Sequence, residues 1–227
     1  MKEIEAKFFV IDLNTIRRRV TRLGGRLTAR RHLERNWRYD LPGDPLAKER
    51  SLLRLRQDQR TTLTYKRRGR SIEQREEIEL PVADTAAAAE LLGALGYRVI
   101  GGYENYRREY ALGRVRVMLD ELPFGDFVEV EGPTFSAVRD QAARLGLAWD
   151  RRVRRPYLDL FDELRSAYSL RSREASFKGL AARPEVRVDQ IGLRDAMVRD
   201  AAAPSGSRSA GSGRQSRTPR RRVTDDR

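Results

Sequence analysis

Residues 3–8, Glu-Ile-Glu-Ala-Lys-Phe, alternate charged and apolar side chains near the start of the chain. Neighbouring side chains of a β-strand point to opposite faces, so the alternation places Glu3, Glu5 and Lys7 together on one face. A strand with one face in water also alternates in this way. The meaning of the pattern therefore depends on whether it recurs along the chain.

Four further segments show a charged or polar face backed by an apolar one. Their polar sets are Arg54 with Arg56, Thr64 with Lys66, Arg75 with Glu77 and Glu79, and Glu129 with Glu131. A solvated face normally mixes charges, whereas here like charges stand two residues apart, where they repel. Such sets persist more readily when an ion of opposite charge binds between them, a divalent cation for carboxylates and phosphate for arginines.

Six cations on these strands and a later one suit a ligand with several negative charges. They are Lys7, Arg54, Arg56, Lys66, Arg75 and Arg107. Magnesium usually takes one or two carboxylates together with phosphate oxygens, which matches the glutamate pairs. A barrel interior lined by both kinds of residue would hold a metal polyphosphate.

The pattern along residues 1–164 predicts strands interrupted by two or three helices. Strands are expected at 2–10, 26–40, 52–57, 61–66, 73–80, 97–112, 114–122 and 126–131, and helices at 12–23, 84–96, 134–145 and 156–164. Short turns between strands favour an antiparallel sheet with helices packed outside it, and eight strands permit closure into a barrel. The expected class is α+β.

Length and charge divide the 227 residues unequally. We expect one domain at 1–164, a linker or short appended elements at 165–203 and a disordered basic tail at 204–227. Of the net charge of +14, residues 165–227 carry +8. Such a tail can contact nucleic acid or polyphosphate nonspecifically without defining what the domain does.

The chain has no cysteine and one histidine, His32. Disulfides and thiolate metal sites are therefore excluded, zinc chemistry is disfavoured, and His32 is expected on the outer face of its strand. No apolar run approaches the length that crosses a bilayer, and the first residues lack the apolar segment of a secretion signal. We expect a cytoplasmic protein with no membrane partner.

Taken in order, these motifs resemble the CYTH superfamily, also called the triphosphate tunnel metalloenzymes. The superfamily includes class IV adenylate cyclases, thiamine triphosphatases and inorganic triphosphatases. The resemblance covers residues 1–164 and rests on Glu-x-Glu-x-Lys at 3–7, Leu-Arg-Leu-Arg at 53–56, Thr-Tyr-Lys at 64–66, the set at 75–79, Arg107, Leu-Asp-Glu at 119–121 and residues 125–131.

The resemblance implies a closed eight-stranded antiparallel tunnel and a role for each matching residue. Metal ligands for Mg2+ or Mn2+ would be Glu3, Glu5, Asp120, Glu129 and Glu131. The six cations above would bind phosphate, with Lys7 also catalytic, and Glu77 and Glu79 would hold a second metal or position the attacking water. One departure is Asn105, where several cyclase-like members carry a basic residue. The last helix, with Tyr157, resembles a segment that covers one mouth of the tunnel.

The leading interpretation is hydrolysis of a triphosphate, inorganic or organic, that depends on a divalent metal. Two alternatives stay open: an adenylate cyclase that releases pyrophosphate from ATP, and a module that binds polyphosphate without turnover. A barrel that binds nucleic acid is disfavoured, because its groove would not be lined by three carboxylate pairs. A homodimer is also open.

Overall fold

The computed structural model describes residues 2–68 and 74–198. The tail expected to be disordered, 204–227, lies outside them. Among the described helices, none combines the length and the apolar character that a bilayer crossing requires.

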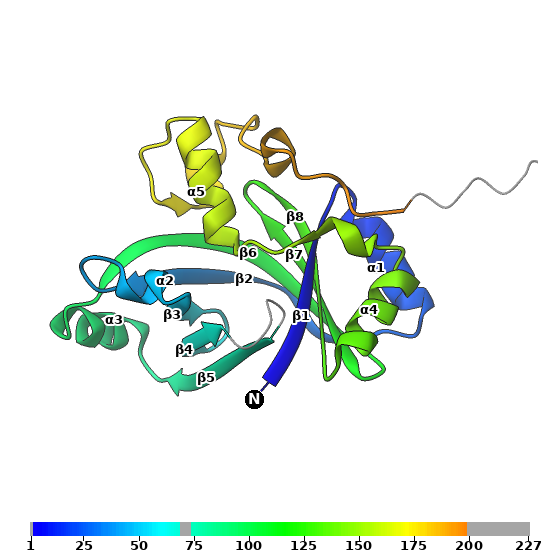
Figure 1. Ribbon diagram of the computed structural model, residues 1–227, viewed down its shortest axis with the longest axis horizontal. Helices are drawn as coiled ribbons and strands as arrows, with labels where there is room; N and C mark the ends of the chain where they lie inside the picture. The colour runs from blue at the N-terminus through cyan, green and yellow to red at the C-terminus, as the bar shows by residue number, and fades with distance from the viewer. Residues whose placement is uncertain (1, 69–73, 199–227) are drawn as a thin grey trace, which may run out of the picture.

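The described strands form one large sheet, which runs in the order β10-β6-β2-β3-β4-β5-β1-β8-β7 (Figure 1). They are β1 (Lys2–Val10), β2 (Arg26–Asp40), β3 (Ser51–Gln57), β4 (Thr61–Arg68), β5 (Gln74–Val82), β6 (Arg98–Leu112), β7 (Val115–Leu122), β8 (Gly125–Gly132), β9 (Arg152–Val153) and β10 (Glu174–Ala175). β6 pairs with β2 along one edge and with β7 along the other, and β9 pairs with β1. Every pairing is antiparallel except the short one between β10 and β6. The expected α+β class with a large antiparallel sheet is confirmed, whereas its closure into an eight-stranded tunnel stays a prediction.

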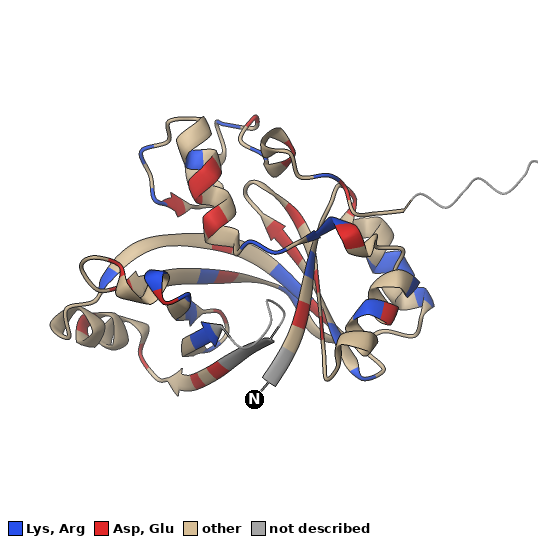
Figure 2. Ribbon diagram, in the orientation of Figure 1, with Lys and Arg blue, Asp and Glu red and all other residues tan. Residues whose placement is uncertain are grey.

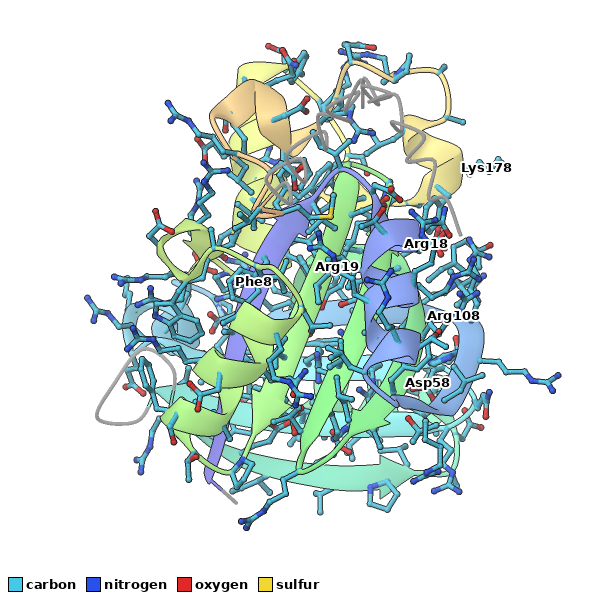
Figure 3. All side chains as sticks on the ribbon, turned by 90° about the vertical axis from the view of Figure 1, so that its right-hand side faces the viewer. Phe8, Arg18, Arg19, Asp58, Arg108 and Lys178 are labelled. Atoms are coloured by element: carbon cyan, nitrogen blue, oxygen red, sulfur yellow. The ribbon has the colours of Figure 1, made fainter. Side chains whose placement is uncertain are left out.

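Two helices, α1 (Leu13–Arg22) and α4 (Phe135–Arg144), cover the apolar face of β1, β7 and β8. Phe8, Val128 and Val130 are fully buried on this face beneath Val20 and Val138 of the helices. Both helices start where the sequence places a capping side chain: Asp12 accepts a hydrogen bond from the Thr15 amide, and Thr134 accepts one from Ala137. Figure 3 looks onto this layer from the side of α1.

A third helix, α5 (Tyr157–Ala167), packs with the chain after it on a second core around Phe161, Phe124 and Phe127. β10 adds to the edge of β6, where the Gly102 amide donates to the Arg173 carbonyl at 3.1 Å. A Cβ at Gly101 would lie 2.9 Å from Leu158 Cδ1, so glycine allows this close approach. α6 (Phe177–Leu180) and a 3-10 turn (Val188–Ile191) follow, and the segment returns to β1 through the Ala196 amide and the Phe9 carbonyl.

The other end of the sheet carries α2 (Pro45–Lys48) and α3 (Thr85–Ala94) around a small core of Tyr39, Leu53, Leu55 and Leu92. The sequence predicts only a turn at 41–45, and the structure adds α2 directly after it. The carboxylate of Asp40, fully buried, accepts hydrogen bonds from the Leu41, Leu46 and Ala47 amides and so fixes the start of this helix.

Replacing Leu160 tests whether α5 belongs to the core. Leu160 is fully buried, so Leu160→Ala should lower the free energy of unfolding by about 2–5 kcal/mol in urea titrations. The matched control is Leu95→Ala after α3, where the side chain is 61% exposed and the change should stay within about 0.5 kcal/mol. Equal effects of the two substitutions would contradict the assignment of α5 to the core.

Candidate functional site

The polar faces of the strands surround a cavity of about 380 Å³. Figure 2 shows acidic and basic segments on the strands around the interior. The charged residues that line the cavity are Glu5, Lys7, Arg54, Arg56, Lys66, Glu77, Glu79, Arg107, Arg116, Glu129 and Glu131. The alternation read from the sequence therefore brings nine of the proposed site residues to one cavity.

Carboxylates from β1 and β8 gather on one wall of the cavity. The register places Glu5 directly opposite Glu131 and Lys7 opposite Glu129. Like charges at directly opposed positions of a sheet repel, and Arg116 Nη1 lies 3.4 Å from Glu131 Oε1. Oxygen donors so arranged fit a hard divalent cation such as Mg2+ or Mn2+.

Cations from β3 and β4 form another wall. Lys66 Nζ lies 2.8 Å from Glu77 Oε2, and Arg56 Nη2 lies 3.8 Å from Glu79 Oε2. Arg54 has no ion-pair partner among the described residues, and its Nε atom is buried without a hydrogen bond. A buried guanidinium nitrogen without a hydrogen bond is costly, so Arg54 is suited to an anionic ligand.

Arg107 lies at the centre of a buried network rather than free in the cavity. It donates two hydrogen bonds to Asp120, at 2.7 and 2.6 Å, and one to Glu129 at 2.8 Å. Asp120 is fully buried and also accepts a hydrogen bond from the Tyr157 hydroxyl at 2.8 Å. This network occupies Asp120 with protein donors, while Glu129 remains in the wall of the cavity.

Tyr157, at the start of α5, connects the helix to the charged cavity. Its ring lies under Lys7, whose Nζ is 4.0 Å from the ring centroid and also 4.0 Å from Glu129 Oε1. Burial, with the charges of Asp120 and Glu129, raises the pKa of Tyr157 well above its ordinary value. The hydroxyl therefore stays protonated and serves as a donor.

Two residues of β2, His32 and Glu34, belong to the same interior and were missed as site residues in the sequence. The expectation that His32 lies on the outer face is wrong: its Nε2 lies 3.5 Å from Glu34 Oε1, and its side chain is 14% exposed. From His32 to Asn36 the pairing with β6 is regular, so His32, Glu34 and Asn36 lie on one face of β2. A histidine, a glutamate and an asparagine form no pair of like charges, so the charge pattern of the sequence does not mark this face.

Neighbouring charges determine the protonation states of His32 and Glu34. The hydrogen bond to Glu34 raises the pKa of His32 to about 9. Burial raises the pKa of Glu34, but Arg107 and His32 outweigh it and hold that pKa well below its usual range. Ligand atoms of His32, Glu34 and Asp58 lie within 4.8 Å of one another, yet Arg56 and Arg107 already contact the two carboxylates. The wall with Glu5, Glu129 and Glu131 therefore fits a metal better.

Two proposed site residues, Glu3 and Arg75, are described in backbone only. Their Cα atoms are register partners across β1 and β5. Their side chains lie outside the described residues, so their roles stay predictions.

A comparison with family models identifies the family. The model of the CYTH domain matches residues 1–157, and the chain belongs to this family. Among solved structures, the PH1012 protein of Pyrococcus horikoshii is similar at 28% identity and a TM-score of 0.61, over 69% of this chain and 98% of that one. A "putative adenylate cyclase" of Vibrio parahaemolyticus has the same fold at 23% identity and a TM-score of 0.63, over 70% and 97%. A comparison with curated proteins found no match.

Removing the central arginine should leave buried carboxylates unpaired. Arg107→Met is expected to lower the free energy of unfolding by about 3–5 kcal/mol, because Asp120 and Glu129 lose their partner. Its neighbour Arg108 points to the opposite face and is labelled in Figure 3, and Arg108→Met should cost no more than about 0.5 kcal/mol. Similar losses in both variants would show that Arg107 is not the centre of the network.

The single histidine allows a direct titration. NMR of the His32 ring should give a pKa of about 9 instead of 6.5, and Glu34→Gln should return it towards 6.5. Because the folded pKa lies above the unfolded value, the pair stabilises the fold below pH 6.5, and this stabilisation is lost as the pH rises through about 9. A wild-type pKa near 6.5 would contradict the ion pair.

Proposed function

We propose that this chain is a divalent-metal-dependent triphosphatase whose strands enclose the substrate in a tunnel. The observation that carries the proposal is the sorting of charge in one cavity: Glu5, Glu129 and Glu131 lie on one wall and Arg54, Arg56 and Lys66 on another. Membership in the CYTH domain family supports the same reading. The pairing of β6 with both β2 and β7 supports the proposed tunnel, because it links the last strand in the sheet order to β6.

In this proposal the metal binds at the carboxylate wall, which is formed by Glu5, Glu129 and Glu131. Glu5, Glu129 and Glu131 would hold Mg2+ or Mn2+, with Glu3 extending the set from the same strand and Asp120 supporting it from behind. When bound, the ion neutralises charge on the phosphate oxygens and offsets the repulsion between Glu5 and Glu131. The carboxylates of the chain are then the groups that fix where the phosphates lie.

Phosphate binding falls to the cations. Arg54, whose buried Nε has no partner among the described residues, forms hydrogen bonds to phosphate oxygens together with Arg56 and Lys66. Arg75 stays a predicted phosphate contact. Lys7 lies between the carboxylate wall and Tyr157, where it counters negative charge that develops on the transferred phosphoryl group. Arg107 holds Asp120 and Glu129 in place and adds positive charge to the site.

In this proposal Glu77 and Glu79 of β5 activate the attacking water. Glu77 lies within hydrogen-bond reach of Lys66, and Glu79 accepts a hydrogen bond from Thr64 at 3.3 Å. Either side chain can orient water towards the terminal phosphorus and accept its proton. If a ribose hydroxyl attacks the inner phosphorus instead, the same charges serve a cyclase, so the product decides between the two reactions.

A product assay tests the proposal. The purified protein is incubated with inorganic triphosphate, thiamine triphosphate or ATP, each with Mg2+ or Mn2+, and free phosphate should be released. Cyclic AMP with pyrophosphate would make the chain a cyclase. Tight binding without any product would make it a binding module.

Single substitutions connect the turnover to the carboxylate wall. Glu5→Gln and Glu131→Gln should each reduce turnover by at least about 100-fold and weaken Mg2+ binding measured by calorimetry. The matched control, Glu90→Gln on the exposed side of α3, should leave both unchanged. Full activity in Glu5→Gln would remove this wall from the mechanism.

A further inference from the structure

A second cavity of about 320 Å³ adjoins the charged one. The two cavities share the lining residues Leu52, Arg54, Lys66 and Pro156. Arg54 therefore lies on the border between them. The second cavity is enclosed by β2, β3, β6 and the start of α5. Leu52, Tyr103 and Leu158 give it apolar walls of the kind that hold a flat organic group.

Asn36 lines this second cavity, and its amide oxygen lacks a partner. The residue is 2% exposed, and Oδ1 is buried without a hydrogen bond from any described residue. Buried polar atoms are nearly always paired, so an unpaired acceptor on the side chain of a residue that lines a cavity indicates a place where a ligand can donate.

The network of buried charges fixes which amide atom of Asn36 is the unpaired one. Glu34 and Asp120 accept hydrogen bonds from Asn105 Nδ2 at 3.1 and 3.3 Å. Because ionised carboxylates only accept, Asn105 must direct its amino group at them and its oxygen away from them. Asn105 Oδ1 then accepts from Asn36 Nδ2 at 3.1 Å, which leaves Asn36 Oδ1 as the acceptor.

A fixed acceptor discriminates between ring substituents. An amino group on the ligand ring would donate to Asn36 Oδ1, whereas a carbonyl in the same place would bring two acceptors together. Rotating the Asn36 amide to suit a carbonyl would break its bond to Asn105 and, through Asn105, the bonds to both carboxylates. Glu34 and Asp120 therefore determine a preference in a cavity that neither of them lines.

We propose that the second cavity binds the organic group of an organic triphosphate and that Asn36 selects a ring bearing an amino group. This inference rests on the proposed function, because the phosphates must lie in the charged cavity for the ring to reach Asn36. Arg54 then contacts the phosphate nearest the organic group, and Tyr103 contacts the ring. Asn36 is a specificity-determining residue in this arrangement.

The test compares ligands that differ in one ring substituent, an amino group or a carbonyl, and in the hydrogen on the neighbouring ring nitrogen. Non-hydrolysable imido analogues of ATP and ITP carry an amino group and a carbonyl, respectively, at the same ring position. Calorimetry with Mg2+ should show at least about tenfold tighter binding of the ATP analogue to the wild-type protein. Binding of both analogues within about twofold, or of neither, would overturn the inference.

Two variants assign the preference to Asn36. Asn36→Leu should reduce the ratio of the two affinities to about one, whereas the matched Asn14→Leu on the exposed side of α1 should keep it. A preference that survives Asn36→Leu would overturn the role of this residue. If Asn36→Leu does not fold, the wild-type comparison alone still decides whether an amino group is selected.

The binding readout separates this inference from the proposed function. A clear preference in binding without release of phosphate from any triphosphate would keep the second cavity and reject the triphosphatase. Release of phosphate together with equal binding of the two analogues would keep the triphosphatase and reject the role of Asn36.

Discussion

Charge buried inside a β-sheet is the constraint on which this structure depends, because each buried ion loses its hydration and must find a partner within the fold. Arg107 of β6 supplies that partner for three carboxylates, Glu34 of β2, Asp120 of β7 and Glu129 of β8. These four strands are neighbours through the pairings of β2 with β6, β6 with β7 and β7 with β8, and Arg107 lies directly opposite Asp120 in the register. The pairing of β6 with β7 joins strands from opposite ends of the sheet order, so the buried ion pairs lie across the place where these ends meet.

The same constraint makes α5 part of the site. Asp120 has acceptor capacity beyond the two hydrogen bonds from Arg107, and the Tyr157 hydroxyl of α5 uses it. The chain after α5 holds the helix in place through β10 on the edge of β6 and through the Phe9 carbonyl of β1. Residues beyond the match to the CYTH domain thus help to position a side chain that contacts Lys7 and Asp120.

The sequence predicts the sheet and much of the charged cavity because alternation is a local property of a regular strand. Glu5, Arg54, Lys66 and Glu129 follow the parity of β1, β3, β4 and β8, whose pairings are regular. His32 and Glu34 of β2 also share a face, but no pair of like charges marks that strand. Alternation also does not predict that Arg107 binds Asp120 while Arg54 has no partner among the described residues. The choice of ion-pair partner for each charged side chain depends on packing between strands, so it cannot be predicted from the local sequence pattern.

Neutral residues show the limit of reading function from charge motifs. Asn36 and Asn105 carry no charge and match no signature, yet the carboxylates on either side of Asn105 leave only one orientation for both amides. The buried carboxylates therefore determine the orientation of neutral side chains through hydrogen bonds. The direction of each bond is fixed because ionised carboxylates cannot donate. Members of one family can share every ion-binding residue and still differ in the organic group they accept, because that choice lies with the residues the ions orient.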